Sequence, residues 1–240
     1  MVAHYSLSLQ WKDNAQHPLF PAMAKRIFIT GIGTDVGKTL VSAVVTEALH
    51  ADYWKPIQAG FDAGTDAEFV RSMLSNKTSV VHDELYRLHT PVSPHIAARK
   101  DGVVIDLQLI EQQATQLKSS GGERPLIIEG AGGLLVPLNE KEKVIDLVRI
   151  LDATVIVVSR NYLGSINHSL LTAANCRQAA LIVAGWIFVD DYLSYEHEIV
   201  EWSGYPSLGS IPHLPVIDKT SIRLAADRLR PELEKMISQS

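Results

Sequence analysis

Residues 26–39 read RIFITGIGTDVGKT, and this stretch decides the fold of the chain. The run Arg26–Thr30 is short, apolar and rich in isoleucine, which predicts a buried β-strand. Lys38–His50 carries apolar side chains at helical spacing, which predicts an α-helix. A glycine-rich turn between them brings backbone N–H groups to the start of the helix, where they and the helix dipole attract an anion.

This turn resembles a P-loop, the phosphate-binding loop of many nucleotide-binding proteins. In that motif Lys38 would neutralise β- and γ-phosphate oxygens, and Thr39 would ligate Mg²⁺. Five residues separate Gly31 from Gly37, one more than in the usual G-x-x-x-x-G-K-[ST] spacing, and Ile32 stands where that spacing needs glycine. The alternative is a chance glycine-rich turn, but the strand before it and the helix after it favour nucleotide binding.

The rest of the chain alternates apolar strands with helices. Further strands are predicted at Tyr53–Ile57, Pro125–Ile128, Ala153–Ser159 and Leu181–Val189, with a short one ending at Ser210–Ile211. Helices are predicted at Asp66–Leu74, Asp106–Lys118, Lys143–Leu151, Ser165–Ala179, Asp191–Trp202 and Ser221–Ile237, with Asp106 as an N-cap. Continuously apolar strands between helices are typical of a parallel sheet covered on both faces, so we expect a doubly wound α/β fold. Ligands of such sheets bind at the carboxyl ends of the strands.

The composition fits one domain preceded by an extension. Residues 1–24 show no periodicity and contain Pro18 and Pro21, which predicts a poorly ordered arm. Residues 25–240 are predicted to form a single domain. Hydrophobic residues make up 46% of the chain and charged residues 20%, which is enough apolar material for a core and excludes a disordered protein.

Charge and cysteine content narrow the possible partners and locations. The formal net charge of −5 argues against general binding to nucleic acids or anionic membranes. The one cysteine, Cys176, excludes an intramolecular disulfide and a cysteine-based zinc site. No apolar run reaches the ~20 residues needed to span a bilayer, and the first residues lack the pattern of a signal peptide. We therefore expect a soluble, cytoplasmic protein.

Three charged side chains are candidates for the chemistry, two at the ends of predicted strands and one at the start of a predicted helix. Lys55 begins the stretch KPIQAG, whose proline and glycine make a stiff turn, so its ammonium group would point towards the phosphates. A strand-end lysine that extends into water is the alternative. Asp66 opens a predicted helix, either as its N-cap or as a Mg²⁺ ligand. Glu129 follows a buried strand, where a carboxylate is costly unless it is paired or binds a metal. With Thr39, the two carboxylates would form an oxygen-rich site suited to Mg²⁺.

Seven short stretches together resemble the dethiobiotin synthase family, whose members are ATP-dependent ligases that close the ureido ring in biotin synthesis. The stretches are Thr30–Thr39, Lys55–Gly60, Ser93–Ala97, Glu129–Gly133, Leu163–Thr172, Ala184–Trp186 and Gly209–Pro212, in the order of the family. The longer P-loop is the family's own form. The resemblance implies a homodimer with a seven-stranded parallel sheet. It also implies 7,8-diaminononanoate, CO₂ or bicarbonate, and ATP as substrates, with Mg²⁺ as the cofactor.

The resemblance also implies roles for particular residues. Lys55 and Lys38 would be catalytic, and Thr39, Asp66 and Glu129 would hold Mg²⁺. The expected nucleotide-binding residues are Asp35, Val36, Gly37, Lys38, Thr39, Leu40, Asp66, Glu129, Gly130, Ala131, Gly132, Asp190, Pro212, His213 and Leu214. The expected substrate-binding residues are Thr34, Lys38, Lys55, Ala59, Leu163, Gly164 and Asn167, with the segment Leu163–Asn167 reaching the substrate across the dimer interface.

The chain departs from the family at two positions. The resemblance implies that an amine of the substrate reacts with CO₂ to give a carbamate, which ATP then phosphorylates. Ala59 stands where the family usually has a serine or threonine whose hydroxyl touches this carbamate, so that contact is lost or comes from Gln58, Thr34 or the backbone. Val189-Asp190 replaces an Asn-Asp pair that reads adenine in well-known members. Valine cannot form a hydrogen bond with a base edge, so we predict a weaker preference for ATP over other nucleoside triphosphates.

Two other classes of P-loop protein are alternatives to a ligase. A nucleotide-dependent switch or partitioning ATPase usually carries a lysine early in the loop, where this chain has Ile32 and Gly33. An amidotransferase relative that acts on cobyrinate would need a fused glutaminase domain with a nucleophilic cysteine, and Cys176 lies within a predicted helix. Because one fold serves all three classes, the residues of the site must decide between them.

Overall fold

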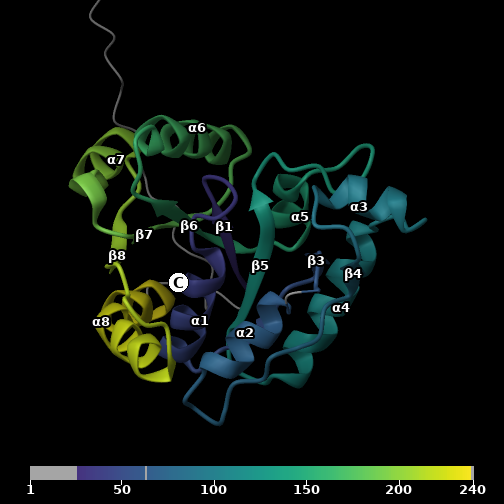
Figure 1. Cartoon of the computed structure of the whole chain (residues 1–240), viewed down its shortest axis with the longest axis horizontal. Helices are drawn as coiled ribbons and strands as arrows, with labels where there is room; N and C mark the ends of the chain where they lie inside the picture. Colours follow the sequence, from purple (N-terminus) through teal and green to yellow (C-terminus); the bar gives the residue numbers. More distant parts are fainter. Residues whose placement is uncertain (1–25, 63, 239–240) are drawn as a thin grey trace, which may run out of the picture.

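The run Arg26–Gly31 forms β1, which lies inside a parallel sheet of six strands in the order β2-β5-β1-β6-β7-β8. The other strands are β2 (Asp52–Trp54), β5 (Leu126–Gly133), β6 (Thr154–Arg160), β7 (Val183–Val189) and β8 (Ser207–Ile211). The computed structural model describes residues 26–62 and 64–238, so the predicted extension 1–24 lies outside the described residues. The doubly wound α/β fold is confirmed (Figure 1).

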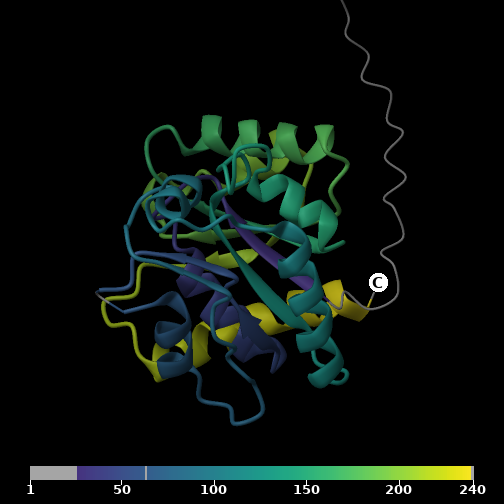
Figure 2. The ribbon, with the colours of Figure 1, turned by 90° about the vertical axis from the view of Figure 1, so that its right-hand side faces the viewer.

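Helices cover both faces of this sheet (Figures 1 and 2). One face carries α1 (Lys38–Leu49), α2 (Asp66–Met73) and α8 (Lys219–Ser238). The other face carries α4 (Leu107–Ser120), α5 (Val144–Ile150), α6 (Ser165–Gln178) and α7 (Glu196–Ser203). Side chains of β1 alternate between the two cores, with Ile27 and Ile29 in the first and Phe28 in the second, as the pleat of a strand requires.

The predicted strand Tyr53–Ile57 is divided in two. Pro56 has no N–H with which to continue the ladder, so β2 ends at Trp54 and a separate strand, β3 (Ile57–Ala59), begins after it. β3 pairs with β4 (Tyr86–Leu88) in a small parallel sheet of two strands. The main sheet therefore has six strands and not the seven that the resemblance implied. In the part of the chain that the structure describes, a single bridge, between Tyr53 and Val81, continues the sheet beyond β2.

Other boundaries match the predicted pattern with small shifts. Asp106 is the N-cap of α4, as predicted, because its side chain accepts hydrogen bonds from the N–H groups of the first turn. β5 continues past Ile128 as far as Gly133, and a helix that was not predicted, α3 (Pro94–Lys100), follows the small sheet. The segment predicted as one helix from Asp191 begins as a 3₁₀ turn, η1 (Tyr192–Ser194), before α7. Within the described residues, no helix is long and apolar enough to cross a membrane.

Candidate functional site

The glycine-rich loop lies between β1 and α1, at the carboxyl end of the sheet. Gly37 precedes α1 in a left-handed conformation with φ of 91°, and a Cβ there would meet the methyl groups of Val189 at 3.2 Å, so only glycine fits easily. Ile32, the residue that lengthens the loop, donates its backbone N–H to the Val158 carbonyl at 3.0 Å. The extra residue thus prolongs the pairing of β1 with β6 and leaves the turn itself short.

Lys38 lies at the start of α1 and is only 8% exposed. Its Nζ donates to the carbonyl of Gly33 at 3.0 Å, which folds the side chain back along the loop. Burial lowers the pKa of Lys38, although the nearby carboxylate of Glu129 acts in the opposite direction. Because its ammonium group is bonded to the loop backbone, Lys38 lies next to the space that a bound phosphate would fill.

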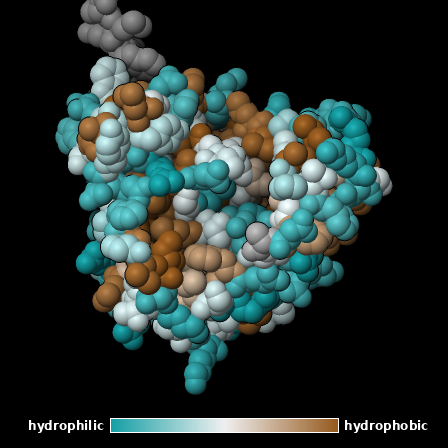
Figure 3. Space-filling model, in the orientation of Figure 1, coloured by the Kyte–Doolittle hydropathy of each residue, from teal (hydrophilic) through white to brown (hydrophobic). Residues whose placement is uncertain are grey.

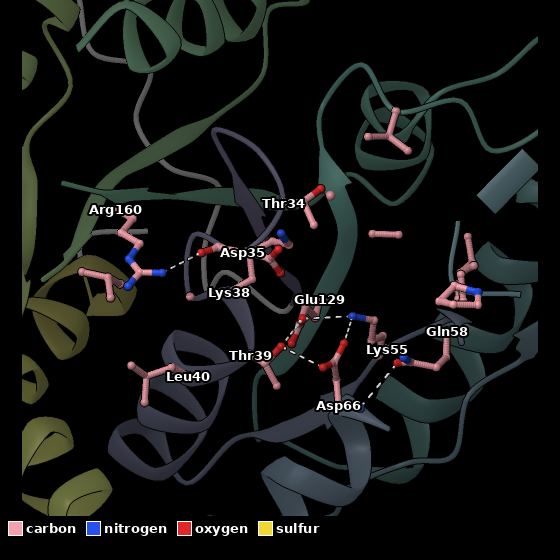
Figure 4. Close-up of a pocket in the computed structure, with 18 of the residues that line it drawn as sticks. Thr34, Asp35, Lys38, Thr39, Leu40, Lys55, Gln58, Asp66, Glu129 and Arg160 are labelled. Carbon is pink, nitrogen blue, oxygen red and sulfur yellow. Dashed lines mark hydrogen bonds and ion pairs between the residues drawn. The ribbon is translucent and has the colours of Figure 1, made fainter. Parts of the chain in front are cut away.

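Three oxygen-bearing side chains converge beside this lysine (Figure 4). The hydroxyl of Thr39 lies 3.0 Å from Oδ1 of Asp66 and 2.9 Å from Oε1 of Glu129. Lys55 forms ion pairs with both carboxylates, and its Nζ lies 3.1 Å from Oε1 of Glu129. Burial alone would lower the pKa of Lys55, but Glu129 and Asp66 together raise it, so this lysine stays charged. The alternative of a strand-end lysine in water is therefore wrong.

Asp66 is the first residue of α2 but does not cap it. The N-cap is Thr65, whose hydroxyl accepts from the Glu68 N–H at 3.1 Å, while Glu68 accepts from the Thr65 N–H at 3.0 Å. This capping box satisfies the end of the helix and leaves the Asp66 carboxylate directed at Lys55 and Thr39. The N-cap interpretation of Asp66 is wrong, and Thr65-x-x-Glu68 is a sequence signal by which the capping box was predictable.

Glu129 has a further partner that the sequence did not reveal. The hydroxyl of Tyr53, in β2, donates to Oε2 of Glu129 at 2.8 Å, and both residues are buried. Burial, with the charge of Glu129, raises the pKa of Tyr53 well above its ordinary value, so the phenol remains a donor. Tyr53 therefore holds one carboxylate oxygen of Glu129, while the other faces Thr39 and Lys55.

The set formed by Thr39, Asp66 and Glu129 fits a hard divalent cation. Its donor atoms are oxygens, and one of its carboxylates is 1% exposed and lies beside a hydroxyl. Among the described residues there is no cluster of three or more His, Cys, Asp or Glu that could hold a metal. A cation here would thus depend on oxygen ligands from elsewhere, which is the usual way that Mg²⁺ binds between protein and substrate phosphates.

A cleft of 990 Å³ contains most of the predicted site residues. The predicted residues that line it are Thr34, Asp35, Gly37, Lys38, Thr39, Leu40, Lys55, Ala59, Asp66, Glu129, Ala131, Gly132, Asp190, Pro212, His213 and Leu214. Val36 and Gly130 are buried beside it, and Leu163, Gly164 and Asn167 lie away from it at the start of α6. Gln58, expected only as an alternative contact for the carbamate, also lines the cleft, as do Ser93 and Arg160, which the predicted site did not include.

A second cavity, of 410 Å³, adjoins the first on the other side of the loop. Thr34 and Val136 line both cavities, and the side chains of α6 that line the second include His168 and Leu171. Two leucines of this region are exposed to solvent. Leu171, which lines the cavity, is 55% exposed, and Leu163, just before α6, is 84% exposed. This region is therefore apolar, while the centre of the cleft is charged.

Comparisons with known proteins show which family this chain resembles. A family model described as an AAA domain matches residues 25–221. An ATP-dependent dethiobiotin synthetase of Christiangramia forsetii is 44% identical over 212 residues, which are 88% of this chain and 99% of that protein. One of Cytophaga hutchinsonii is 52% identical over 164 residues, which are 68% of this chain and 76% of that protein.

A solved structure shares the fold at low sequence identity. The MinD cell division protein of Aquifex aeolicus has a TM-score of 0.58 and 17% identity, over 90% of this chain and 98% of that one. That likeness concerns the fold alone, whereas the sequence relatives share their identity over most of their length. On this basis, the chain belongs to the family of ATP-dependent dethiobiotin synthetases.

Proposed function

We propose that this chain is an ATP-dependent dethiobiotin synthetase. In the reaction, one amine of 7,8-diaminononanoate adds to CO₂ and loses a proton, which gives a carbamate. A carbamate oxygen then attacks the γ-phosphorus of ATP, and ADP leaves. The second amine attacks the carbonyl carbon of the resulting mixed anhydride and loses a proton, the bond from that carbon to the phosphate oxygen breaks, and phosphate leaves as the ring closes.

The observation that carries this proposal is the pair of buried lysines beside two carboxylates and a threonine. A carbamate oxygen and a γ-phosphate are both negative, so their approach needs concentrated positive charge. Lys38 and Lys55, which are 8% and 7% exposed, supply two fixed cations where the surroundings screen them little. Their positions suit Lys38 to the phosphate under the loop and Lys55 to the carbamate at the end of β2.

A magnesium ion would complete the site. Thr39, Asp66 and Glu129 would hold it, and when bound it would neutralise β- and γ-phosphate oxygens. The backbone of Asp66 is held by Gln58, because the Asp66 N–H donates to the side-chain oxygen of Gln58 at 3.4 Å. The remaining contacts with the nucleotide are proposed for the other predicted nucleotide-binding residues that line the cleft. These are Asp35, Gly37, Leu40, Ala131, Gly132, Asp190, Pro212, His213 and Leu214.

The diamine would bind between the two cavities. Thr34 lines both, so a carbamate near Lys38 and Lys55 would leave the aliphatic tail to extend into the apolar second cavity. Ala59 offers no hydroxyl to the carbamate, so Thr34, Gln58 or the backbone would provide that contact.

The exposed Leu163 and Leu171 are suited to a contact with a second copy of the chain, and a homodimer is proposed on this basis. The proposal takes residues 25–240 as one domain that acts in the cytoplasm.

The proposal is tested by release of phosphate from ATP and Mg²⁺ with bicarbonate, in the presence and in the absence of 7,8-diaminononanoate. We expect release that requires the diamine and a product with the mass of dethiobiotin. Lys55→Ala is the matched control and should abolish both signals. Hydrolysis of ATP at the same rate with and without the diamine would contradict the ligase reaction and favour a nucleotide-dependent switch.

A further inference from the structure

We propose that Arg160 sets the base selectivity of the nucleotide site by occupying the carboxylate of Asp190. This inference rests on the proposed function, because it takes the cleft as a nucleotide site. It adds a specificity-determining residue that acts at the end of the cleft opposite Lys55 (Figure 4).

The cleft changes character from one end to the other. On the far side of the loop from Lys55, its lining includes Leu40 from α1, Val189 at the end of β7, and Leu214 and Ile217 after β8. Hydrophobic surface gathers beside the central hollow, on the side of β8 and α8, in Figure 3. With phosphates held at the loop, this apolar end is where a flat base would be buried.

Asp190 is the acidic side chain among these apolar groups, and its backbone is fixed. Its N–H donates to the Ile211 carbonyl at 3.0 Å, and its carbonyl accepts from Nδ2 of Asn161 at 3.0 Å. The residue adopts a left-handed conformation with φ of 62°. The residues at the ends of β6 and β8 therefore hold the backbone of Asp190, which follows β7.

Arg160 occupies one oxygen of that carboxylate. Its Nε donates to Oδ2 of Asp190 at 2.6 Å, and its Nη1 donates to the carbonyl of Asp35 in the loop at 3.3 Å. The other oxygen, Oδ1, lies 3.6 Å from Nδ1 of His213. The arginine side chain is 48% exposed and the aspartate side chain 18%, so the pair lies at the wall of the cleft and not in the core.

A carboxylate with two free oxygens would read guanine. The N1–H and the exocyclic N2–H of guanine are parallel donors, which match the two oxygens, whereas adenine offers a donor beside an acceptor. With Oδ2 taken by Arg160, this paired recognition is blocked. Val189 adds no polar contact of its own, so the site selects bases by shape and gives guanine no advantage.

Binding of diphosphates tests this inference without turnover. The dissociation constants of ADP and GDP are measured for the wild-type chain, for Arg160→Met and for the double variant Arg160→Met/Asp190→Asn. We expect Arg160→Met to raise the affinity for GDP relative to ADP about tenfold or more, because two charge-assisted hydrogen bonds become available. The double variant should lose that gain. IDP, which has the N1–H but no N2 amine, should fall between the two.

Two results would overturn the inference. If Arg160→Met weakens ADP and GDP equally, the arginine binds phosphate and not Asp190. If the ratio is unchanged, Asp190 does not read the base. Arg160→Ala provides the same test should the methionine variant not fold. Failure of the proposed function is distinguishable, because it appears in the wild-type chain as phosphate release that does not depend on the diamine.

Discussion

The two ends of the cleft are built differently. At the reaction end, Lys55, Glu129 and Tyr53 are almost wholly buried, and each of them is held by at least one other member of the group. At the base end, the polar contacts centre on one ion pair in an apolar wall, between the half-exposed Arg160 and the mostly buried Asp190. Buried, interlocked groups keep one geometry, because a lost partner leaves a desolvated charge.

The difference teaches which property each end controls. The chemistry depends on charges fixed in a medium that screens them little, so single changes there should be severe. An exposed ion pair contributes little to stability, so changes at the base end should alter selectivity and leave the fold intact. Variants at the two ends therefore test whether the reaction end controls the chemistry and the base end controls selectivity.

Replacing Lys55 with methionine should lower the rate of phosphate release at least about 100-fold. The side chain keeps its length but loses the charge that faces the carbamate. Single-turnover phosphate release with saturating ATP and diamine measures the effect. A thermal melt of the same variant shows whether the fold persists. A rate within a few-fold of the wild-type chain would contradict the assignment.

Replacing Tyr53 with phenylalanine should weaken Mg²⁺ binding about 10- to 100-fold, because Oε2 of Glu129 loses the donor that orients it. The readout is a Mg²⁺ titration in the presence of ADP, followed by the melting temperature or by tryptophan fluorescence. Tyr86→Phe, which removes a buried hydroxyl that accepts from the Asp106 N–H, is the matched control. Equal Mg²⁺ affinity in Tyr53→Phe and wild type would show that Tyr53 plays only a structural part.

At the base end, the wild-type chain should use CTP or GTP within about tenfold of its kcat/KM for ATP, since Val189 supplies no hydrogen bond that discriminates between bases. Its side chain is 5% exposed and packs against the loop, so it is a structural residue here. Initial rates with each triphosphate at limiting concentration give the comparison. A preference for ATP of about 1,000-fold or more would mean that backbone groups or Asp190 read adenine after all.

The reactivity of the Cys176 thiol should not change in variants at either end of the cleft. It is fully buried in α6, and burial raises the pKa of its thiol to about 12, so the thiol is protonated and unreactive near neutral pH. A thiol reagent at about pH 8 should label it only after denaturation, in the wild-type chain and in the variants above. Rapid labelling of a folded variant would show that the variant loosens the core.

Much of the fold was predictable from local pattern. The strand at Arg26, the loop and the helix from Lys38 follow from periodicity and glycine spacing, and the buried strands follow from their continuous apolar runs. The small sheet of β3 and β4 was missed because three-residue strands carry almost no periodic signal. The break after Trp54 was readable from Pro56, which cannot continue a ladder.

The candidate site was predictable where a motif carries it and not where tertiary packing does. Lys38, Thr39, Lys55 and Glu129 follow strands or glycines in the sequence, so their positions were expected. The partners Tyr53 and Arg160 depend on strand order, because β2 neighbours β5 and β6 neighbours β7. Tyr53 and Glu129 are 76 positions apart in the sequence, and no local pattern links them.

The most direct test of the ligase mechanism follows oxygen atoms. The wild-type chain is given ¹⁸O-labelled CO₂, ATP, Mg²⁺ and 7,8-diaminononanoate for times too short for the label to exchange with water. Because a carbamate oxygen attacks the γ-phosphorus and leaves with phosphate, we predict one ¹⁸O in the released phosphate and one in the ring carbonyl. Phosphate without label would mean that water attacks ATP, and would contradict the account.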